Sequence, residues 1–292
     1  MRYFSFEKSK GCCNLSSFFV KKHNLHILAD KVKSFPRIDR IFYGCEWSVY
    51  TTYSVYLVQT INSEADFLFL DDGIFTYANA KLTLKNYIER IADKFFYGTW
   101  HINTEKYGAL KHNGFMCALF PNLLPNEHKK KKHYTIDINA FLEQISDEKL
   151  IIETSTAQID NIEVLFATDY RWMDFNKNII ERILDCSDNN MRVAIKRHPV
   201  DNGKISFTPP PECNNVYELK STIPVELYYL RYRKTLKKIV GGVSTSLLMA
   251  RKMLPDAEIT AIVFSDSLKD NNTVRVIDFY KKIGITISII NV

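Results

Sequence analysis

Short apolar runs alternate with longer amphipathic segments along this chain of 292 residues, and this alternation is the strongest constraint on its fold. Strands that are separated by helical segments of about 10 to 15 residues pair in parallel, through right-handed crossovers. The second half shows the pattern most clearly, with predicted strands at residues 162–167, 192–196, 238–240, 259–264 and 285–290 and predicted helices at 175–184, 224–231, 246–253 and 274–283. The chain is therefore predicted to be an α/β protein built on parallel sheets.

The first half shows a similar alternation, which weakens before the second half begins. Its predicted elements are strands at 38–44 and 66–70, helices at 47–61 and 82–96, and a short apolar run at 118–123. A chain of this length exceeds the usual size of one core, and the mixed polar stretch between residues 121 and 161 indicates an inter-domain connection. We expect an N-terminal Rossmann-like domain at 1–145, a linker at 146–160 and a C-terminal Rossmann-like domain at 161–292.

The composition is that of a folded globular protein, with 46% hydrophobic and 25% charged residues and a net charge of only +6. A nucleic-acid-binding domain would be more strongly basic, with a pI above about 9, and would carry a recognisable module. The sequence pI of 8.8 and the lack of such a module argue against nucleic acid as a partner. A non-enzymatic binding protein that works through a basic segment is the competing class of function.

The basic segment is the run Lys129–Lys132, which is flanked by His128 and His133. Such a run is either a solvated loop or a peripheral contact with an anionic membrane.

No apolar run approaches the roughly 18 to 20 residues that span a bilayer, and the N-terminus does not resemble a secretory leader. Six scattered cysteines without a Cys-x-x-Cys pair fit a reducing compartment and give no zinc-site spacing. We expect a cytoplasmic protein, with peripheral contact at the inner face of the cytoplasmic membrane as a further expectation.

Candidate chemical groups follow the predicted strands, at the edge of the sheet where ligands bind in open α/β proteins. In the first half, Asp71, Asp72 and Gly73 come directly after a strand. Either carboxylate could act as a general base on a hydroxyl, and Gly73 permits a tight turn, although Asp-Gly also terminates strands without any further role. Thr168 and Asp169 have the same placement in the second half, where Asp169 either takes part in chemistry or only caps the next helix.

A cationic group ends the predicted strand at 192–196. Lys196 and Arg197 are followed by His198, and Pro199 stops the strand because it has no backbone donor. Two cations stabilise a phosphate dianion, and a histidine changes its charge near neutral pH. This group is therefore a candidate for binding or protonating a phosphate leaving group.

Glycines and hydroxyls follow the strand at 238–240. Gly242 lets the backbone approach a ligand, and Ser244, Thr245 and Ser246 lie where a helix N-terminus favours an anion. An N-cap role for the serine is the alternative, and it is compatible with phosphate binding. The segment is neither a Walker P-loop nor a Gly-x-Gly-x-x-Gly fingerprint, and the chain lacks His-Glu-x-x-His and Gly-x-Ser-x-Gly. ATPases, dehydrogenases, zinc peptidases and α/β-hydrolases are thus disfavoured.

Several of these landmarks occur in a recognisable order: Asp71–Gly73, Phe96–Trp100, Phe166–Asp169, His198–Pro199 and Val243–Ser246. In this order they resemble glycosyltransferase family 52, which contains bacterial lipooligosaccharide sialyltransferases, and more loosely other bacterial sialyltransferases and polysialyltransferases. The resemblance implies a GT-B fold, in which two Rossmann-like domains face each other across a cleft and the C-terminal one holds the nucleotide sugar. It also implies an inverting transfer from CMP-sialic acid to a galactose-type hydroxyl of a bacterial surface glycan, without a metal or other cofactor.

The resemblance assigns roles to individual residues. Asp169 matches the general base of the lipooligosaccharide enzymes, His198 matches the acid on the CMP phosphate, and Ser244 and Thr245 match the hydroxyl pair near that phosphate. Related sialyltransferases place their base in the Asp-Asp-Gly motif, which favours Asp71, so both bases stay open. The implied partners are a nucleotide sugar and a glycan or glycolipid acceptor, with a homodimer as a further expectation. A UDP-hexose donor in the same fold is the closest alternative.

Overall fold

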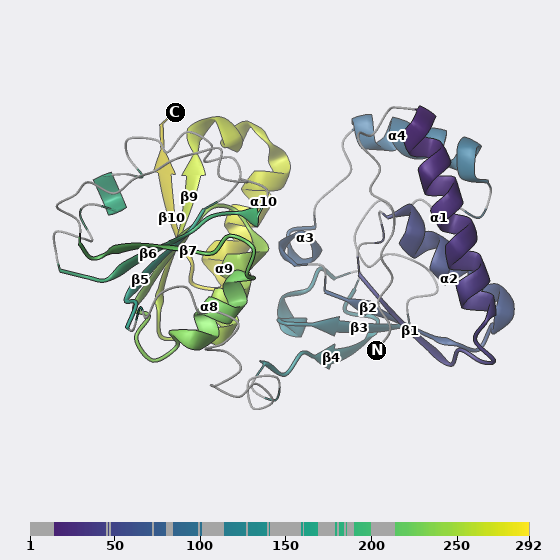
Figure 1. Ribbon diagram of the computed structural model, residues 1–292, viewed down its shortest axis with the longest axis horizontal. Helices are drawn as coiled ribbons and strands as arrows, with labels where there is room; N and C mark the ends of the chain where they lie inside the picture. Colours follow the sequence, from purple (N-terminus) through teal and green to yellow (C-terminus); the bar gives the residue numbers. More distant parts are fainter. Residues whose placement is uncertain are drawn as a thin grey trace. The chain divides into compact units, whose positions relative to one another are not determined.

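The computed structural model consists of two compact units, residues 1–136 and 137–292, and each is an α/β unit built on a parallel sheet (Figure 1). The residues that the structure describes are 15–44, 46, 48–71, 73–79, 84–98, 100, 114–126, 128–138, 140, 159, 161–168, 179, 181–183, 185, 190–199 and 214–291. The linker predicted at 146–160 lies outside the described residues, apart from Ile159, and its position stays a prediction.

The N-terminal unit is a parallel sheet with strand order β1-β2-β3-β4. In chain order its elements are α1 (Leu15–Lys33), β1 (Arg40–Tyr43), α2 (Val49–Ile61), β2 (Asp66–Leu70), α3 (Ile74–Tyr77), α4 (Leu84–Tyr97), β3 (Phe115–Ala118), the 3-10 helix η1 (Pro121–Leu123) and β4 (Lys132–Thr135). The predicted strand at 66–70 is confirmed as β2, an inner strand in which Phe67, Leu68 and Phe69 are all buried. Such a continuous apolar run is typical of a parallel strand covered on both faces.

The lysine run leads into β4, at the edge of the described sheet. Lys129 and Lys130 are exposed, and Lys131 is half-buried, so that burial lowers the pKa of its amine. Lys132 is in β4, and its Nζ lies 5.6 Å from the centre of the Phe115 ring. Lysines on an edge strand discourage pairing with another chain. The run therefore has a structural role at the sheet edge besides any role in binding.

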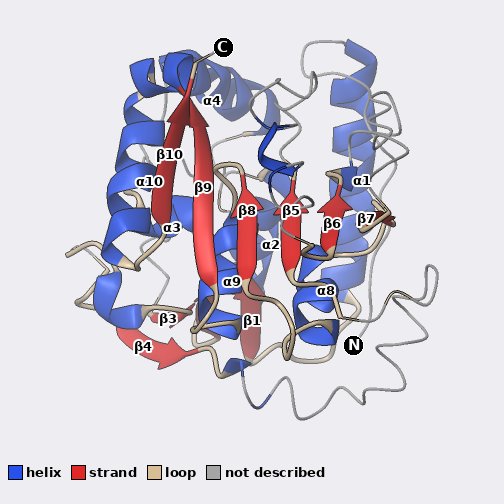
Figure 2. Cartoon of the chain, turned by 90° about the vertical axis from the view of Figure 1, so that its left-hand side faces the viewer, coloured by secondary structure: helices blue, strands red, loops and turns tan. Residues whose placement is uncertain are grey.

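The C-terminal unit is a larger parallel sheet with strand order β10-β9-β8-β5-β6-β7, which Figure 2 shows side by side. In chain order its elements are β5 (Val164–Ala167), β6 (Val193–Lys196), β7 (Val216–Leu219), α8 (Val225–Arg231), β8 (Lys238–Gly241), α9 (Thr245–Met253), β9 (Glu258–Phe264), the 3-10 helix η3 (Ser265–Lys269), α10 (Asn271–Lys282) and β10 (Thr286–Ile290). The five strands predicted in this half are confirmed, and β7 is an additional strand. Helices α8, α9 and α10 lie along one side of the sheet (Figure 1).

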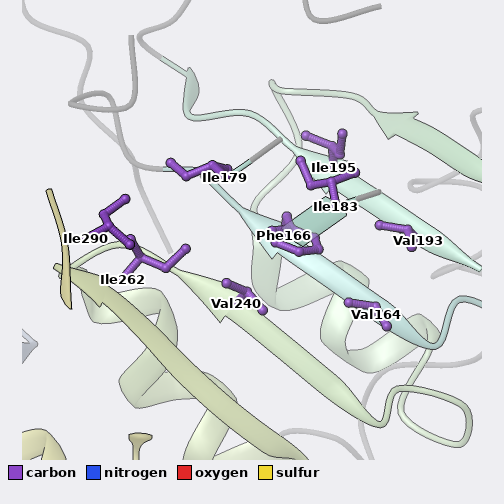
Figure 3. Packing of buried hydrophobic residues seen from close by; sticks show 9 residues of the cluster. All are labelled: Val164, Phe166, Ile179, Ile183, Val193, Ile195, Val240, Ile262 and Ile290. Carbon is purple, nitrogen blue, oxygen red and sulfur yellow. The ribbon is translucent and has the colours of Figure 1, made fainter. Parts of the chain in front are cut away.

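The core of this unit comes from alternating strand residues. Val164 and Phe166 of β5 pack in one cluster with residues of β6, β8, β9 and β10 and with two helical isoleucines (Figure 3). Leu165, between them on β5, is also fully buried. Because successive side chains of a strand point to opposite faces, both faces of the sheet are covered. The predicted helix at 175–184 lies mostly outside the described residues, but its Ile179 and Ile183 are members of this cluster.

The order of the strands reverses at one place in the C-terminal sheet. The chain runs from β5 outward through β6 to β7, then returns to β8 on the other side of β5 and continues outward through β9 to β10. Ligands of open α/β sheets bind at such a reversal, beyond the carboxyl ends of the strands. Here that place is marked by the residues that follow β5 and β8.

Candidate functional site

Thr168 and His198 are joined where β5 and β6 end. The Thr168 N–H donates to the carbonyl of Lys196 at 2.9 Å, and the His198 N–H donates to Oγ1 of Thr168 at 3.2 Å. Thr168 is buried, whereas His198 is half-buried. The threonine hydroxyl thus holds the main chain of His198 next to the reversal of the strand order, while the imidazole keeps partial access to solvent.

Lys196 and Arg197 are buried and bind other parts of the protein. The Lys196 ammonium donates to the carbonyl oxygens of Arg197, at 2.7 Å, and Ser221, at 2.9 Å. Burial lowers the pKa of Lys196 to about 8, and the charge of Glu226 opposes the change. Arg197 Nε donates to the Glu218 carboxylate on β7 at 2.5 Å. These contacts brace the segment that carries His198; a contact of either cation with phosphate stays a prediction.

The segment after β8 is shaped by close packing and by an N-cap. Gly241 ends β8, and a Cβ there would lie 2.8 Å from Cδ2 of the buried Leu247 and 3.2 Å from the Ala167 carbonyl oxygen, so a larger residue requires this packing to shift. Ser244 Oγ accepts a hydrogen bond from the Ser246 N–H at 3.1 Å, which confirms the predicted N-cap of α9. The Oγ atoms of Ser244 and Ser246 are 2.6 Å apart, and Thr245 between them is exposed. We call residues Ser244–Ser246 the hydroxyl loop.

The hydroxyl loop is therefore placed where an anion would be bound. The N-terminus of α9 carries a partial positive charge, and the loop lies directly beyond β8, beside the strand reversal. Gly242, which precedes the loop, is buried. Pro199, the last described residue before the gap at 200–213, is exposed. The residues predicted to bind substrate in this half thus lie at the ends of three neighbouring strands, β8, β5 and β6.

Asp71 forms a second group in the N-terminal unit, at the end of β2. Its Oδ1 accepts from the Gly73 N–H at 2.8 Å, and its Oδ2 accepts from the Tyr77 hydroxyl and from the Leu119 N–H at 3.3 Å. Burial raises the pKa of Asp71, and the hydrogen bonds from Tyr77 and the backbone oppose the rise. Gly73 has a φ of +95°, which confirms the predicted tight turn. Asp71 is thus a half-buried, oriented carboxylate.

Tyr77, Leu119 and Phe120 were not predicted from the sequence. Tyr77 bridges two segments, because its hydroxyl also accepts from the Phe120 N–H at 3.0 Å. Burial, with the neighbouring Asp71 charge, raises the pKa of Tyr77, so this phenol stays a donor to the carboxylate. The sequence analysis predicted the turn at Asp71–Gly73 but gave no sign of the hydrogen bonds that Tyr77 and Leu119 make to Asp71.

Two of the predicted catalytic residues, Asp72 and Asp169, lie outside the described residues, so the choice between Asp71 and Asp169 as base stays open. Within the described ranges, no group of three or more His, Cys, Asp or Glu side chains could hold a metal ion. No helix in the part of the chain that the structure describes is long and apolar enough to cross a membrane. Metal independence and location in the cell stay predictions.

Comparison with known families identifies the chain. The sequence model of the alpha-2,8-polysialyltransferase (POLYST) family matches residues 20–263, which is most of the chain. The chain belongs to the alpha-2,8-polysialyltransferase family. This family member is therefore a glycosyltransferase of the sialyltransferase type, and the interpretation as a non-enzymatic binding protein is not supported. No curated protein sequence matches it significantly.

Solved structures give the fold of this polysialyltransferase-family protein. An alpha/beta-galactoside alpha-2,3-sialyltransferase from the luminous marine bacterium Photobacterium phosphoreum matches with a TM-score of 0.53 at 13% identity, over 91% of this chain and 83% of that one. The glycotransferase of kitacinnamycin matches with a TM-score of 0.53 at 10% identity, over 98% of this chain and 72% of that one. These likenesses confirm the predicted GT-B class, and the sialyltransferase prediction is confirmed at the level of the family.

Proposed function

We propose that this glycosyltransferase transfers sialic acid from CMP-sialic acid to a hydroxyl of a glycan or glycolipid acceptor, with inversion and without a metal. The observation that carries the proposal is the grouping of the hydroxyl loop, Thr168 and His198 at the strand reversal of the C-terminal sheet. Membership of the polysialyltransferase family supports the choice of donor. The narrower kinship with glycosyltransferase family 52 rests on the sequence landmarks alone.

The C-terminal unit binds the leaving group in this proposal. The hydroxyls of Ser244, Thr245 and Ser246 and the N-terminus of α9 hold the CMP phosphate, because helix N-termini and hydroxyl donors favour anions. His198 donates a proton to the departing phosphate, and its main chain is already fixed by Thr168. Charge on the leaving group is therefore stabilised by groups of this chain, so that the reaction needs no Mg²⁺.

Asp71 is the proposed base for the acceptor hydroxyl. Its carboxylate is oriented by three donors, and burial raises its pKa, which makes it a stronger base than an exposed aspartate. Asp169 is the second candidate, supported by the resemblance to the lipooligosaccharide enzymes. Comparing Asp71→Asn with Asp169→Asn separates them, because loss of the base lowers kcat by roughly 10²- to 10⁴-fold, whereas loss of a helix cap changes mainly stability.

The acceptor is a terminal sugar hydroxyl, which belongs either to a sialic acid or to a galactose-type residue. The family name describes alpha-2,8 transfer, in which the acceptor is another sialic acid. The Photobacterium enzyme is named for galactoside acceptors, in agreement with the galactose-type hydroxyl predicted from the sequence landmarks. Incubating the purified protein with CMP-sialic acid and either lactose or an alpha-2,8-linked disialyl primer, followed by mass spectrometry and NMR of the new linkage, identifies the acceptor and the stereochemistry.

His198→Ala is the decisive variant for this mechanism. We expect turnover with CMP-sialic acid to fall by roughly 10²- to 10⁴-fold, because general acid catalysis is lost. His26→Ala, at an exposed position of α1, is the matched control and should keep full turnover. Full turnover of His198→Ala would refute the assigned role.

The donor is tested separately from the catalytic residues. A ligand present at 100 times its dissociation constant adds about 2.7 kcal/mol to the free energy of unfolding. CMP is expected to raise the melting temperature, whereas UDP at the same concentration is not. Stabilisation by UDP alone would move the assignment to the UDP-hexose alternative.

The membrane and the oligomeric state complete the proposal. The exposed Lys129 and Lys130 are proposed to hold the enzyme at the anionic inner face of the cytoplasmic membrane, near a lipid-linked acceptor. Cosedimentation with vesicles that contain phosphatidylglycerol, and its loss when both lysines are replaced by glutamine, tests this contact. Light scattering in solution tests the homodimer.

A further inference from the structure

The hydroxyl loop is joined to a distant tyrosine through both main-chain groups of its first residue. The Ser244 N–H donates to the Tyr280 hydroxyl at 2.9 Å, and that hydroxyl donates to the Ser244 carbonyl at 2.6 Å. One phenol therefore acts as acceptor and donor toward the same residue. Tyr280 belongs to α10, 36 residues farther along the chain.

The Tyr280 side chain is held rigidly by its surroundings. The Tyr280 side chain is 0% exposed, so the surrounding core fixes the ring. Its carbonyl accepts a hydrogen bond from the Ile285 N–H at 2.9 Å, which ties the end of α10 to the start of β10. At the other end of α10, Asp270 caps the helix by accepting from the Thr273 N–H at 3.1 Å. The phenol is thus held in place by the packing around its ring and by the hydrogen bonds at both ends of its helix.

The bonds within the loop have a different effect. Ser244 Oγ accepts from the Ser246 N–H, and the Ser244 carbonyl accepts from the Leu247 N–H at 3.2 Å. These partners are at most three residues apart, so their bonds set the shape of the turn but not its place on the sheet. The long-range pair with Tyr280 fixes where the turn lies, and with it the direction of the Ser244 and Ser246 hydroxyls.

We infer that Tyr280 is a positioning residue of the donor site, which acts by holding the hydroxyl loop in the orientation that receives the phosphate of the nucleotide. The inference rests on the proposed function, because it takes the hydroxyl loop to be the phosphate site. Preorganised donors bind a charged group more tightly than donors that must be ordered first. Tyr280 does not touch the substrate; it acts through Ser244.

Tyr280→Phe is the direct test, since it keeps the buried ring and removes only the hydroxyl. The Kd for CMP and the KM for CMP-sialic acid should rise about tenfold, while the KM for the acceptor stays unchanged. Amide hydrogen exchange of residues 243–247 should become faster. Tyr232→Phe is the matched control, because Tyr232 is also buried and its hydroxyl also donates to a backbone carbonyl, that of Ile159 at 3.2 Å.

The outcomes separate a positioning role from a merely structural one. Weaker CMP binding and faster exchange in Tyr280→Phe, with neither in Tyr232→Phe, supports the inference. If Tyr280→Phe binds CMP as tightly as the control Tyr232→Phe does, the inference is overturned, whatever the melting temperatures of the two variants. A wild-type protein that binds no cytidine nucleotide would overturn the proposed function instead, and the exchange of residues 243–247 would still decide whether Tyr280 holds the loop.

Discussion

Replacement of Lys196 by methionine should change how the stability of the C-terminal unit depends on pH. Lys196 is only 4% exposed, and burial lowers the pKa of its amine from 10.5 to about 8. A difference of this size between the folded and unfolded states corresponds to about 3 kcal/mol. Methionine has a similar volume and no titrating group, so it removes this contribution.

The sign follows from which state loses the proton first. Below pH 8 both states hold the proton, and the folded state carries the cost of burying the charge. Between pH 8 and 10.5 the folded state has released the proton while the unfolded state still binds it, so the wild-type free energy of unfolding rises with pH. Relative to Lys196→Met, the wild type should therefore gain about 3 kcal/mol between pH 7 and pH 11.

Scanning calorimetry of both proteins at several pH values over this range measures the effect. For a unit of about 150 residues, 3 kcal/mol corresponds to roughly 6 to 12 °C in melting temperature. Loss of the donor to Arg197 and Ser221 adds a cost to the variant that does not change with pH, and other titrating groups cancel in the difference. Lys234→Met, at an exposed lysine, is the control and should show a constant difference. A constant difference for Lys196→Met as well would refute the reasoning.

Three further predictions concern packing and the proposed base. Gly241→Ala should destabilise the C-terminal unit by about 1 to 3 kcal/mol, because the new Cβ meets Leu247. The control Gly114→Ala, whose new Cβ has nothing within 4 Å, should cost less than about 1 kcal/mol. Equal losses of stability in thermal unfolding would contradict this prediction. Asp71→Asn should lower kcat by roughly 10²- to 10⁴-fold, and the acid limb of the wild-type pH profile should lie above the ordinary aspartate value, because burial raises the pKa of Asp71. Tyr77→Phe removes a donor that opposes this rise, so the acid limb should move to higher pH; an unmoved limb would exclude Asp71 as the titrating base.

The strands that the sequence predicted are mainly those with a continuous apolar run. It missed three strands: β3, which overlaps the predicted apolar run at 118–123 only at Ala118, and β4 and β7, which lie at edges of the described sheets. In β4 no residue is buried, and in β7 only Leu219 is, because an edge strand has a neighbour on one side alone. Their sequences therefore carry little of the apolar signal on which strand prediction depends.

Helix α1 was also missed, although its buried residues Leu25, Leu28, Ala29 and Val32 follow helical spacing. The signal is weakened because the buried stripe also contains Asn24 and the first turn has no acidic residue. In the site, the placement of groups after strands could be predicted from the alternation of elements. Their hydrogen-bond partners could not, since Leu119 is 48 residues from Asp71 and Tyr280 is 36 from Ser244.

The bonds that hold the strand-end segments of the C-terminal unit use main-chain groups at the positions that carry the chemistry. His198 is held through its N–H, and Ser244 is held through its N–H and carbonyl. The place of these segments on the sheet is thus set by Thr168 and Tyr280, although the Ser244 side chain also shapes its own turn by capping α9. Substitutions of the His198 side chain can therefore alter which leaving group is accepted while the bond that holds its main chain is kept, which makes this edge of the sheet a suitable starting point for changing donor specificity by directed evolution.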